Sequence, residues 1–115
     1  MTPIAQVNTP ALLDLVCEQG TTFRFACLYQ DADGEGVYLS DWDATLNMFT
    51  DYGATPVLAL TTGDGSIVLD VDGNITAAAD AASMNMVAVR YRWELTLTSG
   101  PIVDPLIKGF AQVTP

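Results

Sequence analysis

An antiparallel β-sandwich is the fold that this sequence predicts, and three features of the chain indicate it. Segments of alternating apolar and polar residues recur roughly every 8 to 12 residues, as in sandwich folds. Turn-forming residues such as Asp-Gly and Gly-Asp-Gly separate these segments. Only one short stretch, residues 77–85, has a helix-forming composition. With 115 residues, the chain has the length of one domain built around a single core.

The N-terminal part of the chain contains an arm and two predicted strands. Residues 1–10 include two prolines and show no periodicity, so we interpret them as an extended arm that is either frayed or lies on a neighbouring subunit. The sandwich domain then covers residues 11–115. Ala11–Glu18 is a strand candidate, and Thr21–Gln30 has the clear alternation of a strand. Joined by a turn at Gln19-Gly20, the two segments would form a hairpin.

The middle of the chain alternates between turns and short strands. Asp31–Gly36 is a turn, and Val37–Leu39 resumes an extended segment. In Ala44–Phe49 every second residue is Ala, Leu or Met, which predicts a strand. Val57–Thr61 and Ser66–Val71 flank a Gly-Asp-Gly turn and therefore predict a hairpin.

The C-terminal part contains the helix-like stretch and the longest strand. Ala77–Asn85 is rich in alanine and has the length of one or two helical turns. In Val87–Thr98, large apolar side chains alternate with Ala, Arg, Glu and Thr, which fixes the register of a long strand. A last strand follows over Ile102–Val113, where Pro105 marks an edge position or a bulge. Together the elements predict a single immunoglobulin-like antiparallel β-sandwich of about seven to eight strands with one short helical turn.

The composition excludes several classes of function. Four Lys and Arg residues stand against 14 Asp and Glu residues, giving a formal net charge of −10. Nucleic-acid binding is not expected, because neutralising phosphates requires clustered basic residues, and anionic membrane surfaces would repel the chain. The chain has no His, which excludes Ser-His-Asp and Cys-His catalysis and imidazole metal sites within one chain. The sequence predicts no enzyme, no catalytic or metal site and no cofactor.

The termini and the cysteines indicate the compartment in which the chain folds. The N-terminus lacks a basic segment followed by an apolar core, so it does not resemble a secretory signal. No stretch reaches the roughly 18 apolar residues of a membrane helix. We therefore expect synthesis in a cytoplasm. Cys17 and Cys27 would not be cross-strand neighbours in the predicted hairpin, so we expect two reduced thiols packed in the core.

The acidic candidates each have a simpler structural interpretation. Asp31–Glu35 resembles the opening of a calcium loop but lacks the later ligands, and tight turns require Asp and Gly in any case. Asp70–Gly73 is a second acidic turn of this kind. Asp41 and Asp43 have the spacing of a possible acid–base pair, yet close pairs arise by chance among 14 carboxylates. Whether the Asp31–Glu35 turn binds calcium stays open at this point.

Four aromatic residues are candidates for a carbohydrate-stacking platform: Trp42, Tyr52, Tyr91 and Trp93. Tyr91 and Trp93, however, fall on the apolar face of the longest predicted strand, so we expect them in the core.

The four basic residues fall into two groups. Arg90 and Arg92 alternate with Glu94 on the outward face of the longest strand, as a stripe facing solvent or an interface. Arg24 lies on another strand, where it is able to pair with an acidic group of the domain or of a partner. Lys108 has no companion motif.

One ordered set of motifs resembles a known family. In chain order these motifs are Glu18-Gln19-Gly20-Thr21-Thr22-Phe23, Asp33-Gly34, Val37-Tyr38-Leu39-Ser40, Ala44-Thr45-Leu46, Gly65-Ser66-Ile67, Gly73-Asn74-Ile75-Thr76, Tyr91-Arg92-Trp93-Glu94-Leu95 and Leu106-Ile107-Lys108-Gly109-Phe110-Ala111-Gln112-Val113. The pattern resembles a small β-sandwich domain of tailed-bacteriophage virion proteins, and its layout is similar to the N-terminal domain of the baseplate upper proteins. It covers about residues 12–114, although each motif alone is generic strand and turn chemistry. Glu94 departs from the family, whose members often have Asp there.

The resemblance implies a non-enzymatic structural protein of the virion. It would be an adaptor or attachment node that joins neck, tail or baseplate to fibres. The alternatives are a decoration protein on the surface of the head and, in another class, a carbohydrate- or cell-surface-binding β module. The implied partners are other virion proteins (portal or neck, tail, fibre or capsid) and further copies of the chain in a homo-oligomer, without nucleic acid or membrane. Strand edges and the arm of residues 1–10 would supply the contacts, and the chain would reach the virion after synthesis in the host cytoplasm.

Overall fold

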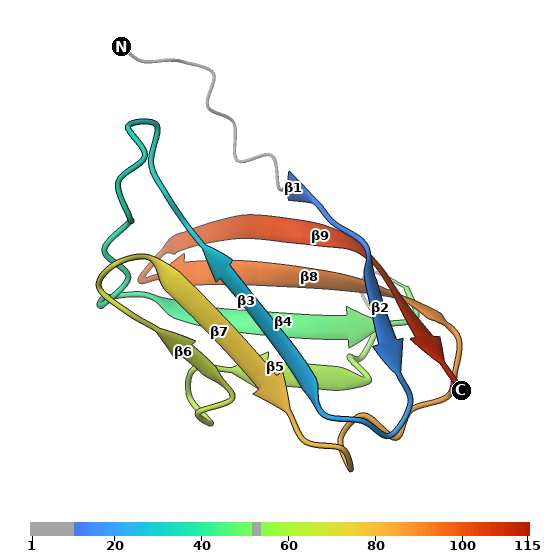
Figure 1. Cartoon of the computed structure of the whole chain (residues 1–115). Coiled ribbons are helices and arrows are strands. Elements are labelled where there is room, and N and C mark those ends of the chain that lie inside the picture. Colours follow the sequence, from blue (N-terminus) through green and yellow to red (C-terminus); the bar gives the residue numbers. More distant parts are fainter. Residues whose placement is uncertain (1–10, 52–53) are drawn as a thin grey trace.

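A computed structural model describes residues 11–51 and 54–115 as two β-sheets packed face to face (Figure 1). These residues form nine strands and no helix. In chain order the strands are β1 (Ala11–Leu12), β2 (Leu15–Glu18), β3 (Phe23–Leu28), β4 (Asp43–Phe49), β5 (Leu58–Thr61), β6 (Ile67–Leu69), β7 (Asn74–Ala79), β8 (Arg90–Ser99) and β9 (Ile102–Thr114). The prediction of an all-β sandwich is confirmed. The arm predicted for residues 1–10 lies outside the described residues.

The strand order of the two sheets is that of an immunoglobulin-like domain. The larger sheet has the order β1-β9-β8-β4-β5, with β2 also beside β9, and the smaller sheet has the order β3-β7-β6. In immunoglobulin notation the smaller sheet contains strands B, E and D, and the larger contains G, F, C and C′. The connectivity therefore confirms the immunoglobulin-like sandwich.

The first two strands pair in parallel with the last strand, which corrects the predicted hairpin of residues 11–18 and 21–30. β1 and β2 keep one register along β9, with Ala11 opposite Ile107 and Leu15 opposite Ala111. β3 joins the smaller sheet instead, beside β7. Alternation along a strand shows which side chains face the core. Because both sheets of a sandwich face the same core, alternation does not show which sheet a strand joins.

The hairpin predicted around the Gly-Asp-Gly turn is wrong for the same reason. β5 pairs with β4 in the larger sheet, whereas β6 pairs with β7 in the smaller sheet. The turn at residues 62–66 therefore leads from one sheet to the other. The hairpin that does form joins β6 to β7 through Asp70–Gly73, where Gly73 has a φ of 91°.

The alanine-rich stretch is a strand followed by a turn, which corrects the predicted helix. Ala77 and Ala79 belong to β7 and are buried, whereas Ala78 between them is exposed. Pairing with β3 on one side and β6 on the other makes β7 the central strand of its sheet, which overrides the helix propensity of alanine. Beyond the strand, the Met84 N–H donates to the carbonyl oxygen of Asp80 at 3.2 Å in a single turn.

Two predicted segments differ from the strands observed. Val37–Leu39 lies outside every strand, and β8 begins at Arg90 rather than at Val87. Val87 and Val89 are exposed because they lie in the connection from β7 to β8.

The predicted core faces of the central strands are confirmed. The buried side chains are Ala44, Leu46 and Met48 on β4 and Tyr91, Trp93, Leu95 and Leu97 on β8. The prediction for Pro105 is confirmed as well. The register of β8 with β9 shifts between Leu95 and Thr96, so Leu106 bulges beside the proline.

Trp93 connects three strands of the larger sheet. Its side chain is fully buried, and its Nε1–H donates to the carbonyl oxygen of Leu13 at 2.8 Å. Gly109 lies directly opposite Trp93 on β9, the strand between β8 and the Leu13 backbone. A Cβ at Gly109 would overlap the Leu13 carbonyl group, so only glycine allows this backbone to approach. The Asp14 carboxylate then accepts the Phe110 N–H at 3.0 Å, at the interruption between β1 and β2.

Two further aromatic contacts place Trp93 and the start of β8. Phe25 on β3 meets Trp93 edge to face, with ring centroids 5.5 Å apart, and so links the two sheets where antibody domains have their disulfide. Two residues before Trp93, the Tyr91 hydroxyl donates to the Val87 carbonyl oxygen at 2.8 Å. This is the tyrosine corner of immunoglobulin-like folds. Both thiols are free, Cys17 buried and Cys27 half-buried, as the sequence predicted.

Gly109→Ala is expected to destabilise the domain strongly. The new methyl group overlaps a backbone carbonyl that cannot move without breaking the bond to Trp93, so we expect a loss of about 2–3 kcal/mol. Gly63→Ala is the control, because its Cβ would lie 3.7 Å from the nearest atom, an ordinary contact. Urea denaturation measures both variants, and equal midpoints would contradict the close approach at Gly109.

Trp93→Phe is expected to cost about 2 kcal/mol or more, because it removes the donor to the Leu13 carbonyl oxygen and leaves a cavity. Trp42→Phe is the matched control. Trp42 is half-buried, and no hydrogen bond of its side chain to a described residue is present. Thermal denaturation followed by circular dichroism should show a clearly larger drop for the change at Trp93. A similar drop for both would indicate that the hydrogen bond adds nothing.

Candidate binding site

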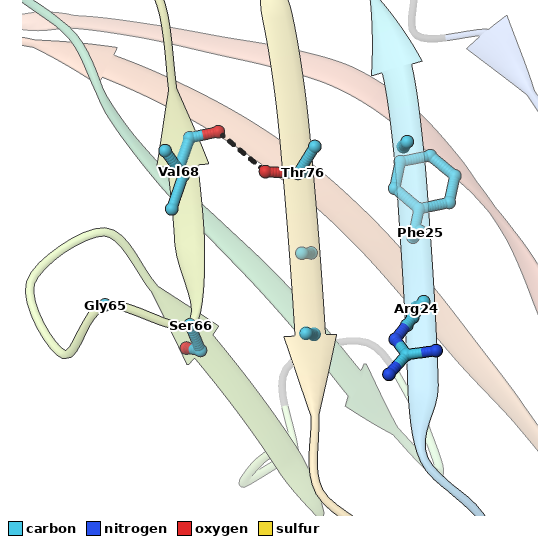
Figure 2. Close-up of a pocket in the computed structure, with 9 residues that line it drawn as sticks. Arg24, Phe25, Gly65, Ser66, Val68 and Thr76 are labelled. Atoms are coloured by element: carbon cyan, nitrogen blue, oxygen red, sulfur yellow. Dashed lines mark hydrogen bonds between the residues drawn. The ribbon is translucent and has the colours of Figure 1, made fainter.

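A groove of about 390 Å³ crosses the outer face of the smaller sheet (Figure 2). It is lined by residues of all three strands and of the turn before β6: Arg24, Phe25, Ala26, Gly65, Ser66, Val68, Thr76, Ala77 and Ala78. No larger sheet or helix covers this face in the described part of the chain. The groove is therefore open to a partner.

The register of the smaller sheet explains why this face is hollow. Thr76 at the centre lies between Ala26 on β3 and Val68 on β6. In the next row Ala78 lies opposite Arg24, and its N–H donates to the Ser66 carbonyl oxygen at 2.9 Å. Small side chains occupy the middle of the sheet, and larger ones stand at its sides. A partner surface is thus able to approach the backbone of β7 closely.

The groove combines apolar side chains with one positive charge. Val68 is 58% exposed, and Leu28 in the row beyond Ala26 is 51% exposed. Arg24 is exposed and has no ion pair or hydrogen bond to another described residue. Figure 2 shows its side chain at one end of the groove, on β3. Such an arrangement suits a ligand that presents apolar groups next to a carboxylate.

A rigid turn borders the groove at β6. The Asp64 carboxylate accepts hydrogen bonds from the N–H and the hydroxyl of Ser66, and the Thr61 hydroxyl accepts from the Asp64 N–H at 3.1 Å. These bonds, first that from the Ser66 hydroxyl, lower the pKa of Asp64. On the sheet itself, the Thr76 hydroxyl donates to the Val68 carbonyl oxygen at 3.4 Å (Figure 2).

The acidic turns use their carboxylates to hold the backbone. Asp31 Oδ1 accepts the N–H groups of Asp33 and Glu35 at 2.9 and 3.0 Å. Asp70 accepts the N–H of Asp72 and both the backbone and side-chain N–H groups of Asn74. Hydrogen bonding, chiefly from the Asn74 side chain, lowers the pKa of Asp70. Within residues 11–51 and 54–115 no three Asp, Glu or Cys side chains are grouped so as to hold a metal ion.

The structure separates the other candidate residues. Asp43 accepts from the Thr62 hydroxyl at 3.0 Å at the start of β4, next to Asp41, whose carbonyl oxygen accepts from Ser99. Of the four aromatic candidates, Tyr91 and Trp93 are buried and Trp42 is half-buried. Tyr52 lies outside the described residues. Tyr91 and Trp93 therefore lie in the core, as expected, and are not available to stack on a carbohydrate.

The basic residues lie on both outer faces of the sandwich. Arg90, Arg92 and Glu94 are on the outward face of β8, as predicted, and Lys108 on β9 lies opposite Glu94. Arg24 stands on the other sheet. The two thiols face the core instead, and burial raises the pKa of both Cys17 and Cys27. A raised pKa keeps a thiol protonated and poorly nucleophilic.

Sequence reasoning identified Arg24 but missed the groove beside it. The signal was present in residues 74–79, where Asn, Thr and Ala alternate with Ile and two Ala. Because the sequence predicts a helix from Ala77 onward, it does not place the outward residue Ala78 on a strand beside β3. The pairing of β7 with β3 places it there.

No family model matches the chain, and no curated protein matches it. A solved structure titled "Structure-based site-directed photo-crosslinking analyses of multimeric cell-adhesive interactions of VGSC beta subunits" matches with a TM-score of 0.46 and 9% identity, covering 99% of this chain and 98% of that one. In the described residues, no helix is long and apolar enough to cross a membrane.

Asp70→Ala is expected to lower the melting temperature at neutral pH, because the turn between β6 and β7 loses three accepted hydrogen bonds. The pKa of Asp70 lies below its usual 3.8 in the folded state. Its stabilising effect is therefore fully present above pH 3.8 and is lost as the pH falls through the lowered pKa. Asp72→Ala is the control, because the Asp72 side chain holds no described group. Melting curves from pH 7 down to acid should show the difference between the two variants shrinking, and a constant difference would contradict the role of the charge.

Proposed function

We propose that this chain is a non-enzymatic structural protein of a tailed-bacteriophage particle. In the particle it acts as an adaptor that joins neck, tail or baseplate to fibres. The ordered motifs from Glu18 to Val113 support this proposal, since they resemble the β-sandwich domains of virion proteins. The immunoglobulin-like sandwich agrees with the fold that this resemblance implies. Fold alone does not define function, so the surface has to supply the remaining argument.

The observation that carries the proposal is the number of large apolar side chains left exposed on so small a domain. They lie on strands of both sheets and in the connections, and include Leu12, Val16, Leu28, Tyr38, Val57, Val68, Val71, Ile102 and Val103. Large exposed apolar side chains on both sheets offer surface that protein partners are able to cover. A protein that is built into a larger assembly contacts its neighbours through more than one side, and these side chains would contribute to those contacts.

The groove over β3, β7 and β6 is the surface best suited to a virion partner. Its small side chains permit close approach, and Arg24 offers a charge that has no partner among the described residues. β3 and β6 are also the edges of their sheet, so their outer backbone groups are available to an added strand. An extended segment of a fibre or tail protein with a carboxylate beside apolar side chains would fit this surface.

The proposal is tested by locating the chain in purified particles of the phage whose genome encodes it. Cryo-electron microscopy should show density for the sandwich at the neck, tail or base of the fibres. Density over the head lattice would overturn the adaptor role in favour of a decoration protein. Absence of the chain from particles, checked by mass spectrometry, would overturn the virion role and favour a binding module.

The groove is tested by incorporation of variants into particles that lack the native chain. Val68→Glu places a charge in the groove and is expected to reduce incorporation at least tenfold, because it adds repulsion and removes apolar contact. Val87→Glu is the matched control, since Val87 is 69% exposed and lies away from the groove. Both variants should melt like the native chain. Equal incorporation of the two would contradict the groove as the docking surface.

A further inference from the structure

Basic side chains are concentrated on the outer face of β8 and β9. The chain has four Lys and Arg residues in all, and three of them are Arg90, Arg92 and Lys108. On β8 the arginines alternate with the buried Tyr91 and Trp93, so both face outward. Lys108 lies on the outward face of β9, opposite Glu94. Glu94 shares this face and the Asp14 carboxylate borders it at Phe110, so three positive and two negative charges meet there on a domain whose net charge is −10.

Phe110 holds the two arginines in place. It lies opposite Arg92, and the guanidinium carbons of Arg90 and Arg92 are 4.2 and 5.1 Å from its ring centroid. Stacking on a ring uses the face of a guanidinium group and not its N–H donors. Ordering the side chains in advance lowers the entropy lost when a carboxylate binds.

Apolar side chains flank the arginines on the neighbouring edge. Leu12 and Val16 on β1 and β2 are each 78% exposed, and they lie beside Lys108 and Gln112 of β9. We define the β8–β9 patch as Arg90, Arg92, Lys108 and Phe110 together with Leu12 and Val16. A basic centre with an apolar rim is a surface that fits an acidic protein segment.

The chain itself presents such a segment, residues 31–35, which we name the acidic finger. It projects from one end of the sandwich (Figure 1). Asp31 accepts two backbone N–H groups within the finger, and the Gln30 side chain donates to the Gly34 carbonyl oxygen at 3.0 Å. The carboxylates of Asp33 and Glu35 are exposed and have no hydrogen bond or ion pair to a described residue. The finger is thus ordered, with two charges available.

The finger does not reach the patch of its own copy. Its base lies near the β8–β9 turn, because Asp104, which is close enough to Tyr29 to help raise the pKa of that hydroxyl after burial, lies opposite Leu97. Arg92 and Arg90 are five and seven residues from Leu97 along β8, or about 17 and 23 Å away at the rise of a β-strand. The finger also extends away from the sheets rather than along them (Figure 1). Only the finger of another copy is able to meet the patch.

We propose that copies of this chain associate by docking the acidic finger of one copy on the β8–β9 patch of the next. Each copy carries one finger and one patch, so docking is either reciprocal in a closed pair or continues head to tail in a ring or filament. Charge complementarity favours this orientation, because three of the four basic residues lie at the β8–β9 patch and Arg24 alone stands on the other sheet. This association does not require the virion role, and the two proposals are tested on different surfaces.

Sedimentation velocity on the full chain over a range of concentrations tests the proposal. The native chain should form oligomers, and Arg90→Glu should raise the dissociation constant at least tenfold. Arg24→Glu makes the same change of charge on the other sheet and should leave the dissociation constant unchanged. A native chain that stays monomeric overturns the proposal, as does an equal effect of the two variants, which would indicate net charge alone.

A mixing experiment separates docking from damage to the fold. The double variant Asp33→Lys/Glu35→Lys should also fail to associate alone. Mixed with Arg90→Glu, it should associate again, because the intact finger of one variant meets the intact patch of the other. Failure of the mixture to associate, with both variants melting like the native chain, would refute docking between finger and patch.

Discussion

The position of the larger sheet's strands depends on one buried polar group, the indole N–H of Trp93. A fully buried tryptophan N–H needs an acceptor, and for Trp93 this acceptor is the Leu13 carbonyl oxygen. The bond therefore passes over Gly109 to Leu13, on the strand beyond. The bond ties the link between β1 and β2 to β8, and the two strands keep one register along β9 on either side of it. The same ring contacts Phe25 and so positions the smaller sheet.

The sandwich manages without the disulfide that secreted immunoglobulin domains use. In its place stand an edge-to-face contact of Phe25 with Trp93 and the hydrogen bond of Tyr91 to Val87. Both need no oxidising environment, and both cysteines are free. Part of the acidic surplus has a structural use. The carboxylates of four residues accept backbone N–H groups in turns: Asp31, Asp64, Asp70 and Asp80.

The sequence was sufficient for some parts of this fold and insufficient for others, for a common physical reason. Period-two alternation located β4 and β8 and placed Arg90 and Arg92 outward, because alternation directly reports the two faces of a strand. Which strand pairs with which depends on the packing of the whole core. The alternation therefore predicts two hairpins whose strands in fact belong to different sheets. At Ala77 and Ala79 the local propensity favours a helix, but pairing with β3 and β6 makes this stretch a central strand. The same error hid the groove beside Arg24, because Thr76, Ala77 and Ala78 of β7 line that groove.

The two outer faces of the sandwich then differ in what they are able to bind. On the smaller sheet, Arg24 stands alone over small side chains, which suits an extended segment that brings its own backbone to β7. On the larger sheet, Phe110 gathers two arginines into a surface whose charge opposes that of the rest of the chain. Because the core lies between them, the two faces are held in fixed relation, and occupation of one leaves the other open. Under the proposed function, these two faces would hold two partners in fixed relation, which is the physical requirement for a connecting role in an assembly.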